Sequence, residues 1–178
     1  MGIKEFLIEN NAHKIGFAKA KDVICDRGFR KACESNACGL YNRCHTCPPC
    51  IGDIDVLMSR INKYEDVLVY QTVGEIEDSY DIEGMFEVGD RHRELDLKAN
   101  EFMKNNYNKD SFLHLGAGGC KICKKCSKID NEPCRFPDKA MSPLEAYGVS
   151  VSQLAEISGL KYINGENTVT YFGAIFFK

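Results

Sequence analysis

Ten cysteines are the residues of this 178-residue sequence whose type and spacing could do chemistry. Seventy residues separate Cys50 from Cys120, and the cysteines fall into two groups on either side of that gap. In a reducing compartment, cysteines that cluster in this way are typical of metal or redox sites rather than of disulfides. The groups are Cys25, Cys33, Cys38, Cys44, Cys47 and Cys50, and then Cys120, Cys123, Cys126 and Cys134.

The second group has the spacing of an iron–sulfur loop. Three cysteines at two-residue intervals let one loop supply three thiolates to a [4Fe–4S] cube, and a more distant fourth cysteine closes the site. The final gap of seven residues is longer than in bacterial ferredoxins. A loop wound around a metal needs small residues, and three glycines stand just before the first cysteine: Gly116, Gly118 and Gly119. The predicted ligands of this cluster are Cys120, Cys123, Cys126 and Cys134.

Zinc is the alternative metal, because four thiolates also satisfy a tetrahedral structural zinc site. Zinc sites usually draw two ligands from each of two knuckles, so the middle cysteine of Cys-x-x-Cys-x-x-Cys would be surplus, whereas a cube uses all three. The spacing therefore favours iron and sulfide. A zinc-binding structural or assembly module is the alternative function.

The first group repeats the triplet with Cys44, Cys47 and Cys50. Cys38 or Cys33 lies upstream as a further ligand, so a second [4Fe–4S] cluster is predicted on four of these five residues. The remaining cysteine, Cys25, has no partner at short spacing and is expected to be a buried structural residue.

Residues 47 to 50, "CPPC", also suit a dithiol oxidoreductase, because a helical pattern follows and a helix N-terminus lowers the pKa of a nearby thiol. Such motifs follow a buried strand, and "GLYNRCHT" is not one, so the cluster is favoured. His45 inside the same group is expected to be a loop residue that faces solvent rather than a metal ligand.

Two blocks of the sequence resemble an uncharacterised family of predicted metal-binding proteins, a domain of unknown function that is common in anaerobic bacteria and archaea. The resemblance implies metal binding through the cysteines and no agreed activity. The first block is Cys33, then Cys38-Gly-Leu-Tyr41, then Cys47-Pro48-Pro49, and the second comprises "GAGGCKICKKC" and "PCRFPDKAMSPLEAYGVSV".

The same resemblance implies that Cys33, Cys38 and Cys47 are the shared positions of the first group. A cluster with three cysteines would keep one iron open for a substrate, unless Cys44 or Cys50 fills that corner. An enzyme with an open iron site on the first cluster is therefore a further alternative, with its acid–base or anchoring groups among Tyr41, Arg43 and His45.

The cysteine groups lie between segments that predict an α+β fold. β-branched and aromatic residues bounded by Gly, Asn or Asp predict strands at 13–20, 66–73, 111–115, 161–163 and 168–177. Asn164-Gly165 predicts a hairpin between the last two, so we expect a small mixed or antiparallel sheet of about five strands. The chain is expected to form one domain, with cysteine loops at about 25–52 and about 116–137.

Apolar residues at helical spacing predict two helices that flank the sheet, at 54–61 and around 88–102. His92 lies on the apolar side of the second helix, where a core histidine with satisfied hydrogen bonds is expected. The acidic stretch 74–90 is expected to be a solvated connection, with a basic partner as the alternative. Capping boxes predict two further helix starts, at Ser142 with Glu145 and at Ser150 with Gln153, the second helix ending at Gly159.

Charge and hydropathy exclude several classes of partner. A net charge of −3 and a pI near 5.8 give no general attraction to nucleic acid or to anionic lipid. No apolar run approaches about 18 residues and no leader is recognised at the N-terminus, so a cytoplasmic protein is expected.

Positive charge gathers around the second cysteine group, which predicts a docking face for an acidic redox partner. The sequence thus predicts a protein that uses two [4Fe–4S] clusters to pass electrons to a partner enzyme or cofactor. The basic residues are Lys121, Lys124, Lys125, Lys128, Arg135 and Lys139, against Asp130, Glu132 and Asp138.

Overall fold

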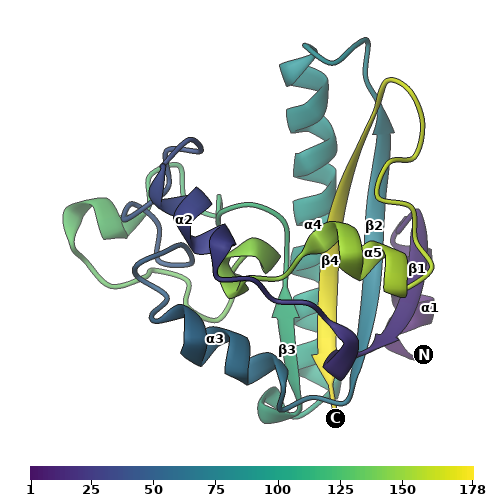
Figure 1. Cartoon of the computed structure of the whole chain (residues 1–178), viewed down its shortest axis with the longest axis horizontal. Helices are drawn as coiled ribbons and strands as arrows, with labels where there is room; N and C mark the ends of the chain where they lie inside the picture. Colours follow the sequence, from purple (N-terminus) through teal and green to yellow (C-terminus); the bar gives the residue numbers. More distant parts are fainter.

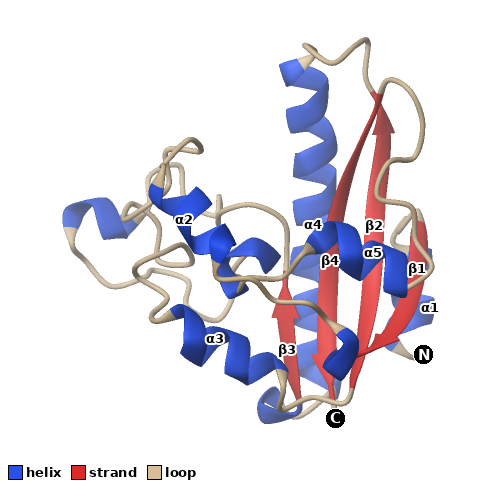
Figure 2. Cartoon of the chain, viewed as in Figure 1, coloured by secondary structure: helices blue, strands red, loops and turns tan.

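The computed structural model describes all 178 residues, and one antiparallel sheet of four strands lies at its centre (Figure 1, Figure 2). The strands follow the order β1 (Lys14–Lys19), β2 (Asp66–Glu75), β4 (Thr168–Phe177) and β3 (Phe112–Leu115). β2 and β4 pair along their whole length, from Asp66 opposite Phe177 to Glu75 opposite Thr168. The predicted α+β class is therefore confirmed.

The sheet has four strands and not the expected five, because residues 161–163 do not form a strand. β4 pairs with β2 along its whole length and with β3 from Ala174 to Phe177 only. Beside the free part of β4, the side-chain amide of Asn164 donates to the Lys161 carbonyl and to the Thr170 hydroxyl, each at 3.0 Å, in place of a hairpin ladder. Ile163 is 74% exposed, and the ring of Tyr162 stacks on Phe172 instead. The hairpin predicted from Asn164-Gly165 is therefore wrong, and this segment forms a loop.

Alternate residues of the central strands face two separate cores, as the period of a strand requires. Val67 and Val69 of β2 face the core under α3 (Ile54–Ile61) and α5 (Val151–Ile157). Leu68 and Tyr70 face the other core, under α1 (Ile3–Glu9) and α4 (Ile82–Asn106). Figure 1 shows α4 and α5 on opposite sides of the sheet.

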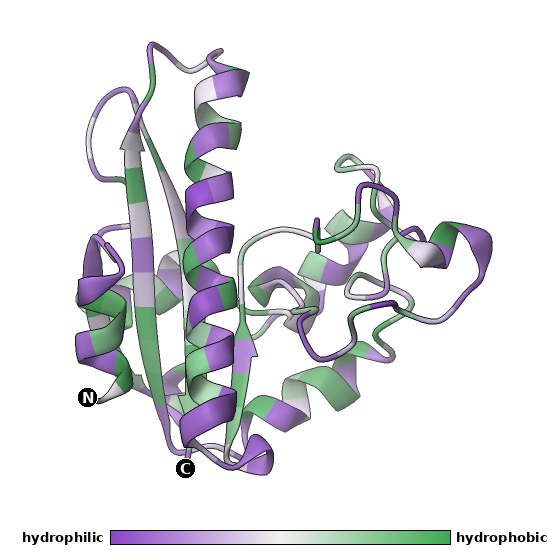
Figure 3. Ribbon diagram, turned by 180° about the vertical axis from the view of Figure 1, so that it is seen from behind, coloured by the Kyte–Doolittle hydropathy of each residue, from purple (hydrophilic) through white to green (hydrophobic).

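Helix α4 carries polar side chains on its buried face. His92, Asp96 and Asn100 recur every four residues and are buried beside Leu95 and Ala99. Its outer face is mostly hydrophilic (Figure 3). The predicted core position of His92 is confirmed, but only its Nδ1 has a hydrogen-bond partner.

The acidic stretch 74–90 is more ordered than a solvated connection. It contains the end of β2, a turn, and the first turns of α4. The side chain of Asp81 caps α4 by accepting the backbone N–H of Gly84 at 2.9 Å, and this bond lowers the pKa of Asp81.

Short helices complete the fold: α2 (Gly28–Glu34), η1 (Ala20–Asp22), η2 (Lys109–Ser111), η3 (Ser127–Asp130) and η4 (Leu144–Tyr147). The helix predicted after Ser142 is only the single turn η4, because Gly148 follows in the left-handed region at φ 76°. The helix predicted after Ser150 is α5, although the Ser150 side chain makes no capping bond. None of the helices combines the length and the apolar character needed to cross a bilayer.

The two cysteine loops lie side by side, apart from the sheet and next to its β3 edge (Figure 1, Figure 2). Hydrogen bonds join the two loops directly, as described below. The fold therefore brings together two cysteine groups that are seventy residues apart in sequence.

Candidate metal centre

Strand β3 leads directly into the second cysteine group through a glycine-rich loop. The N–H of Gly116 donates to the carbonyl of Ser142 at 3.0 Å, and the N–H of Leu144 donates to the carbonyl of Gly116 at 3.0 Å, which ties the start of the loop to η4. Gly118 has φ 67°, a conformation that favours glycine. A Cβ on Gly119 would overlap Leu40 and lie 3.2 Å from the Cys47 sulfur, so the absent side chain lets the two cysteine loops meet.

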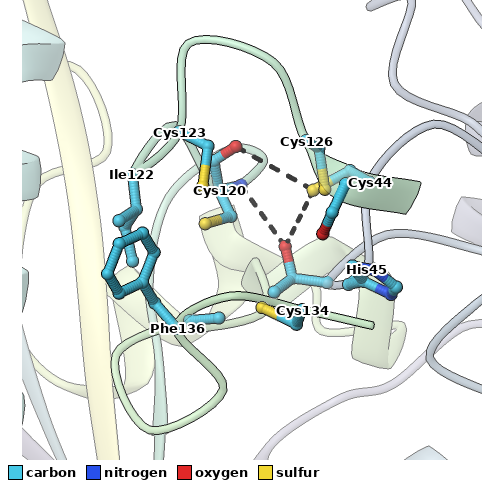
Figure 4. A pocket seen from close by; sticks show the side chains of 11 residues that line it. Cys44, His45, Cys120, Ile122, Cys123, Cys126, Cys134 and Phe136 are labelled. Carbon is cyan, nitrogen blue, oxygen red and sulfur yellow. Dashed lines mark hydrogen bonds between the residues drawn. The ribbon is translucent and has the colours of Figure 1, made fainter. Parts of the chain in front are cut away.

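All four cysteines of the second group line one pocket, and Cys44 of the first group joins them (Figure 4). Ile122 and Phe136 supply apolar walls. The pocket therefore gathers Cys44, Cys120, Cys123, Cys126 and Cys134.

No three Cys, His, Asp or Glu side chains converge closely enough to hold a single metal ion in this conformation. The chemistry of the donors nevertheless fits a metal, because thiolates are the ligands that zinc and iron–sulfur clusters share. No disulfide joins any pair, and all ten thiols are free. The pocket thus contains suitable donor atoms, but these atoms do not converge on a single metal position.

Thr46 connects the two cysteine groups, and the sequence patterns did not single it out. Its buried hydroxyl accepts the backbone N–H of Cys120 at 3.3 Å, which leaves the hydroxyl proton free to point at the Cys44 sulfur, also 3.3 Å away. The Cys44 sulfur in turn lies 3.9 Å from the Cys120 carbonyl oxygen. The only signal in the sequence was a hydroxyl residue inside a cysteine triplet.

His45 makes a second connection between the loops. Its Nε2 lies 2.9 Å from the carbonyl oxygen of Glu132, in the segment between the third and fourth cysteines of the second group. The residue is half-buried rather than facing solvent as expected. Its ring nitrogen is engaged with the backbone, so it braces the two loops.

The buried pair Cys44 and Cys47 has strongly separated thiol pKa values. A hydrogen bond from Cys47 lowers the pKa of Cys44 to about 5, and the Thr46 hydroxyl acts in the same direction against burial. The same hydrogen bond raises the pKa of Cys47, and burial adds to that effect. Cys44 is therefore a thiolate near neutral pH, the form in which a thiol binds metal.

The other first-group cysteines divide by their neighbours. Burial raises the pKa of Cys33, and the charge of Cys38 raises it further. The charge of Cys38 also raises the pKa of Cys47, by less than the hydrogen bond with Cys44 and burial do. Cys50 instead faces the side-chain oxygen of Asn42, with its sulfur 3.8 Å away. Cys25 packs against the main core but is only half-buried, not buried as expected.

The start of α3 argues against a dithiol site at residues 47–50. Asp53 caps this helix, accepting the N–H of Asp55 at 2.8 Å and that of Val56 at 3.4 Å. The free N–H groups of the helix end are therefore bound by a carboxylate and not by a thiol. The raised pKa of Cys47 is also the reverse of what an attacking thiol needs.

An open groove beside the thiols is lined with positive charge. It lies between the cysteine loops and the first turns of α4. Lys121 lies over the ring of Phe86, with Nζ 4.8 Å from the ring centre. Three lysines of the groove were predicted as part of a docking face, Arg43 was expected only as an anchoring group beside the first cluster, and Arg93 on α4 was not singled out. The five cations are Arg43, Arg93, Lys121, Lys124 and Lys125.

These features define a small α+β protein with a cysteine-lined pocket whose donors suit metal. Comparison with protein families places residues 17–177 in the family described as "Predicted metal-binding protein (DUF2284)", so the chain belongs to that family. No curated protein and no solved structure matches the chain.

Proposed function

We propose that this protein transfers single electrons through two [4Fe–4S] clusters held by its two cysteine groups. The contact between the groups is the observation that supports this proposal. The Cys44 sulfur lies 3.9 Å from the Cys120 carbonyl, and Thr46 bridges both residues. Electron transfer falls off steeply with distance, and two cofactors on touching loops would be close enough to exchange electrons.

Cys120, Cys123, Cys126 and Cys134 are the proposed ligands of one cluster, which would store and release single electrons when bound. For the other we propose Cys33, Cys38, Cys44 and Cys47, because Cys44 and Cys47 share a hydrogen bond and the charge of Cys38 acts on both Cys33 and Cys47. Cys50 is then the residue left over, because its sulfur faces Asn42. The Thr46 hydroxyl, aimed at the Cys44 sulfur, would stabilise negative charge on that ligand.

The positively charged groove is the proposed docking face for a redox partner with an acidic surface. Lys125 and Arg93 are each paired with a carboxylate, whereas Arg43 and Lys124 make no ion pair. Unpaired cations on a net acidic chain attract an acidic partner and speed its approach at low ionic strength. The groove also contains Cys120 and Cys123, so a partner bound there would contact the loop of the second group.

Metal and sulfide analysis tests the proposal. The protein, purified without oxygen, should contain about eight irons and about eight acid-labile sulfides per chain, with EPR signals on reduction. Stoichiometric zinc without sulfide would refute the proposal and support a structural zinc module.

Three serine variants test which cysteines are ligands. Cys126→Ser should lose about half of the iron, whereas the matched control Cys25→Ser, outside both predicted ligand sets, should keep all of it. Cys50→Ser should also keep its iron. Equal loss in the Cys25 and Cys126 variants would refute the assignment of ligands.

A further inference from the structure

A connected set of buried polar side chains lies on the sheet under α4, and the proposed function does not use it. The hydroxyl of Tyr70 contacts Asp96 and lies 2.7 Å from Nε2 of His114. His92 Nδ1 lies 2.8 Å from the hydroxyl of Thr72. Tyr70, His92, Asp96 and His114 are each at least nine-tenths buried. These four titratable groups come from three elements. Burying them costs free energy that apolar side chains of similar size would not, so packing alone does not explain them.

Two ring nitrogens of this set have no hydrogen-bond partner, Nε2 of His92 and Nδ1 of His114, and the first of them faces a carboxylate. Nε2 of His92 faces Oδ1 of Asp96 at 3.4 Å, which is long for an N–H···O bond, and that nitrogen has no other partner. When Nδ1 carries the ring proton and donates it to Thr72, two acceptors face each other across this gap. One added proton would complete the bond.

The neighbouring groups leave Asp96 as the site where that proton is held. Burial lowers the pKa of His114 to about 3, so its ring is neutral, and burial raises the pKa of Tyr70 well above its usual range. Burial also raises the pKa of Asp96, against the charge of His92 and the hydrogen bond from Tyr70. The carboxylate is therefore easier to protonate than one in water.

The same carboxylate supports the loop of the second cysteine group. The backbone N–H of Ala117, three residues before Cys120, acts on the Asp96 carboxyl and lowers its pKa. Its side chain occupies the space where a Cβ on Gly116 would be. Asp96 and Cys120 also line the same narrow pocket between α4 and the glycine-rich loop, which offers a route for a proton from solvent.

We propose that Asp96 and His92 form a proton-binding site that would take up one proton when the cluster proposed on the second cysteine group is reduced by one electron. The inference rests on the proposed function. The electron comes from the one-electron donor of that function and the proton from solvent. The proton settles between Oδ1 of Asp96 and Nε2 of His92, so the added negative charge is matched by one positive charge.

The charges around Asp96 and His92 determine whether reduction of the cluster favours or disfavours proton binding. Extra negative charge on the neighbouring loop favours the protonated form, so the reduced state binds the proton more tightly than the oxidised state. The groups that face the site are Tyr70 and Thr72 from β2, His114 from β3, Tyr171 from β4, Arg93 and Lys104 on α4, and Lys121 and Lys139 around the pocket.

The test is an EPR-monitored redox titration of the reconstituted protein between about pH 5 and about pH 9. One of the two midpoint potentials should fall as the pH rises, by about 59 mV per tenfold change in proton concentration where the uptake is complete. Asp96→Asn keeps the shape of the side chain but cannot titrate, so the midpoint potential of this variant should not depend on pH. His92→Gln is a second variant that should weaken the pH dependence, which covers failure of the first to fold.

Glu94→Gln is the matched control, because it removes one carboxylate from the solvent-facing side of α4 and should leave the pH dependence unchanged. A normal EPR signal whose midpoint potential is the same at every pH would overturn the proton site alone. So would a pH dependence of the potential that persists in both variants. The absence of any reducible iron–sulfur signal would overturn the proposed function and this inference together.

Discussion

Removing the Thr46 hydroxyl should uncouple the two cysteine groups. In Thr46→Val the side chain keeps its shape, but the backbone N–H of Cys120 loses its acceptor and the Cys44 sulfur loses a donor. An unsatisfied buried N–H costs about 1–3 kcal/mol. Cys120 is only half-buried, so we expect the low end, about 1–2 kcal/mol. For a chain of this length, that loss lowers the melting temperature by roughly 2–8 °C.

Urea unfolding of the metal-free protein measures the loss, and Thr46→Ser, which retains the hydroxyl, is the control. The valine variant should also have a higher Cys44 thiol pKa, because the hydroxyl is one of the groups that lower it. A valine variant as stable as the wild type, with an unchanged thiol pKa, would refute the role assigned to this hydroxyl. Equal destabilisation by serine and valine would attribute the effect to packing instead.

Three further predictions follow from the same structure. Replacing Lys124 and Lys125 by Glu should lower one cluster midpoint and slow reduction by an acidic donor at low salt, since negative charge disfavours the more negative reduced cluster. Gly173→Ala should destabilise the protein by about 1–3 kcal/mol in urea, because the new Cβ would overlap the buried ring of Tyr70. Burial raises the pKa of Asp96 above its unfolded value, so the stability this group contributes is lost as the pH rises. Asp96→Asn should therefore gain stability relative to the wild type as the pH rises from about 4.

Each of these has its own control. For the lysine variant, the control replaces Lys14 and Lys161, exposed residues outside the groove, by Glu. This change should leave the cluster midpoint and the rate of reduction unchanged. The cost of Gly173→Ala should shrink in a Tyr70→Ala background, and equal costs in both backgrounds would show that the ring is not the obstacle. For Asp96→Asn, unfolding free energies that differ from the wild type by the same amount at every pH would contradict the raised pKa.

Local patterns predicted most of the elements, because their residues carry a clear periodicity. The strand expected at 168–177 and the helix expected at 54–61 have the observed bounds. The predicted fifth strand does not form: the partners of β4 are strands about a hundred and about sixty residues earlier in the chain, and not the segment next to it in sequence. Pairing between distant segments leaves no mark in a short window of sequence.

The cysteines could be grouped from spacing, but the contact between the groups could not. It depends on the missing side chain of Gly119 and on the Thr46 hydroxyl, two small residues with many ordinary roles. Asp96 was also missed, although a carboxyl four residues after a buried histidine, between Leu95 and Ala99, was a usable signal. Tyr70 and His114 joined this set only through tertiary packing of β2 and β3 against α4.

The central place of β4 in the sheet has a consequence for how the chain is made. On the ribosome both cysteine groups emerge before residues 168–177, the only strand with which β3 pairs. Until β4 is synthesised, β3 and the glycine-rich loop that follows it have no sheet to anchor them. The attachment of the cysteine loops to the sheet is therefore completed only after residues 168–177 have been synthesised, because the pairing of β3 must wait for this C-terminal segment.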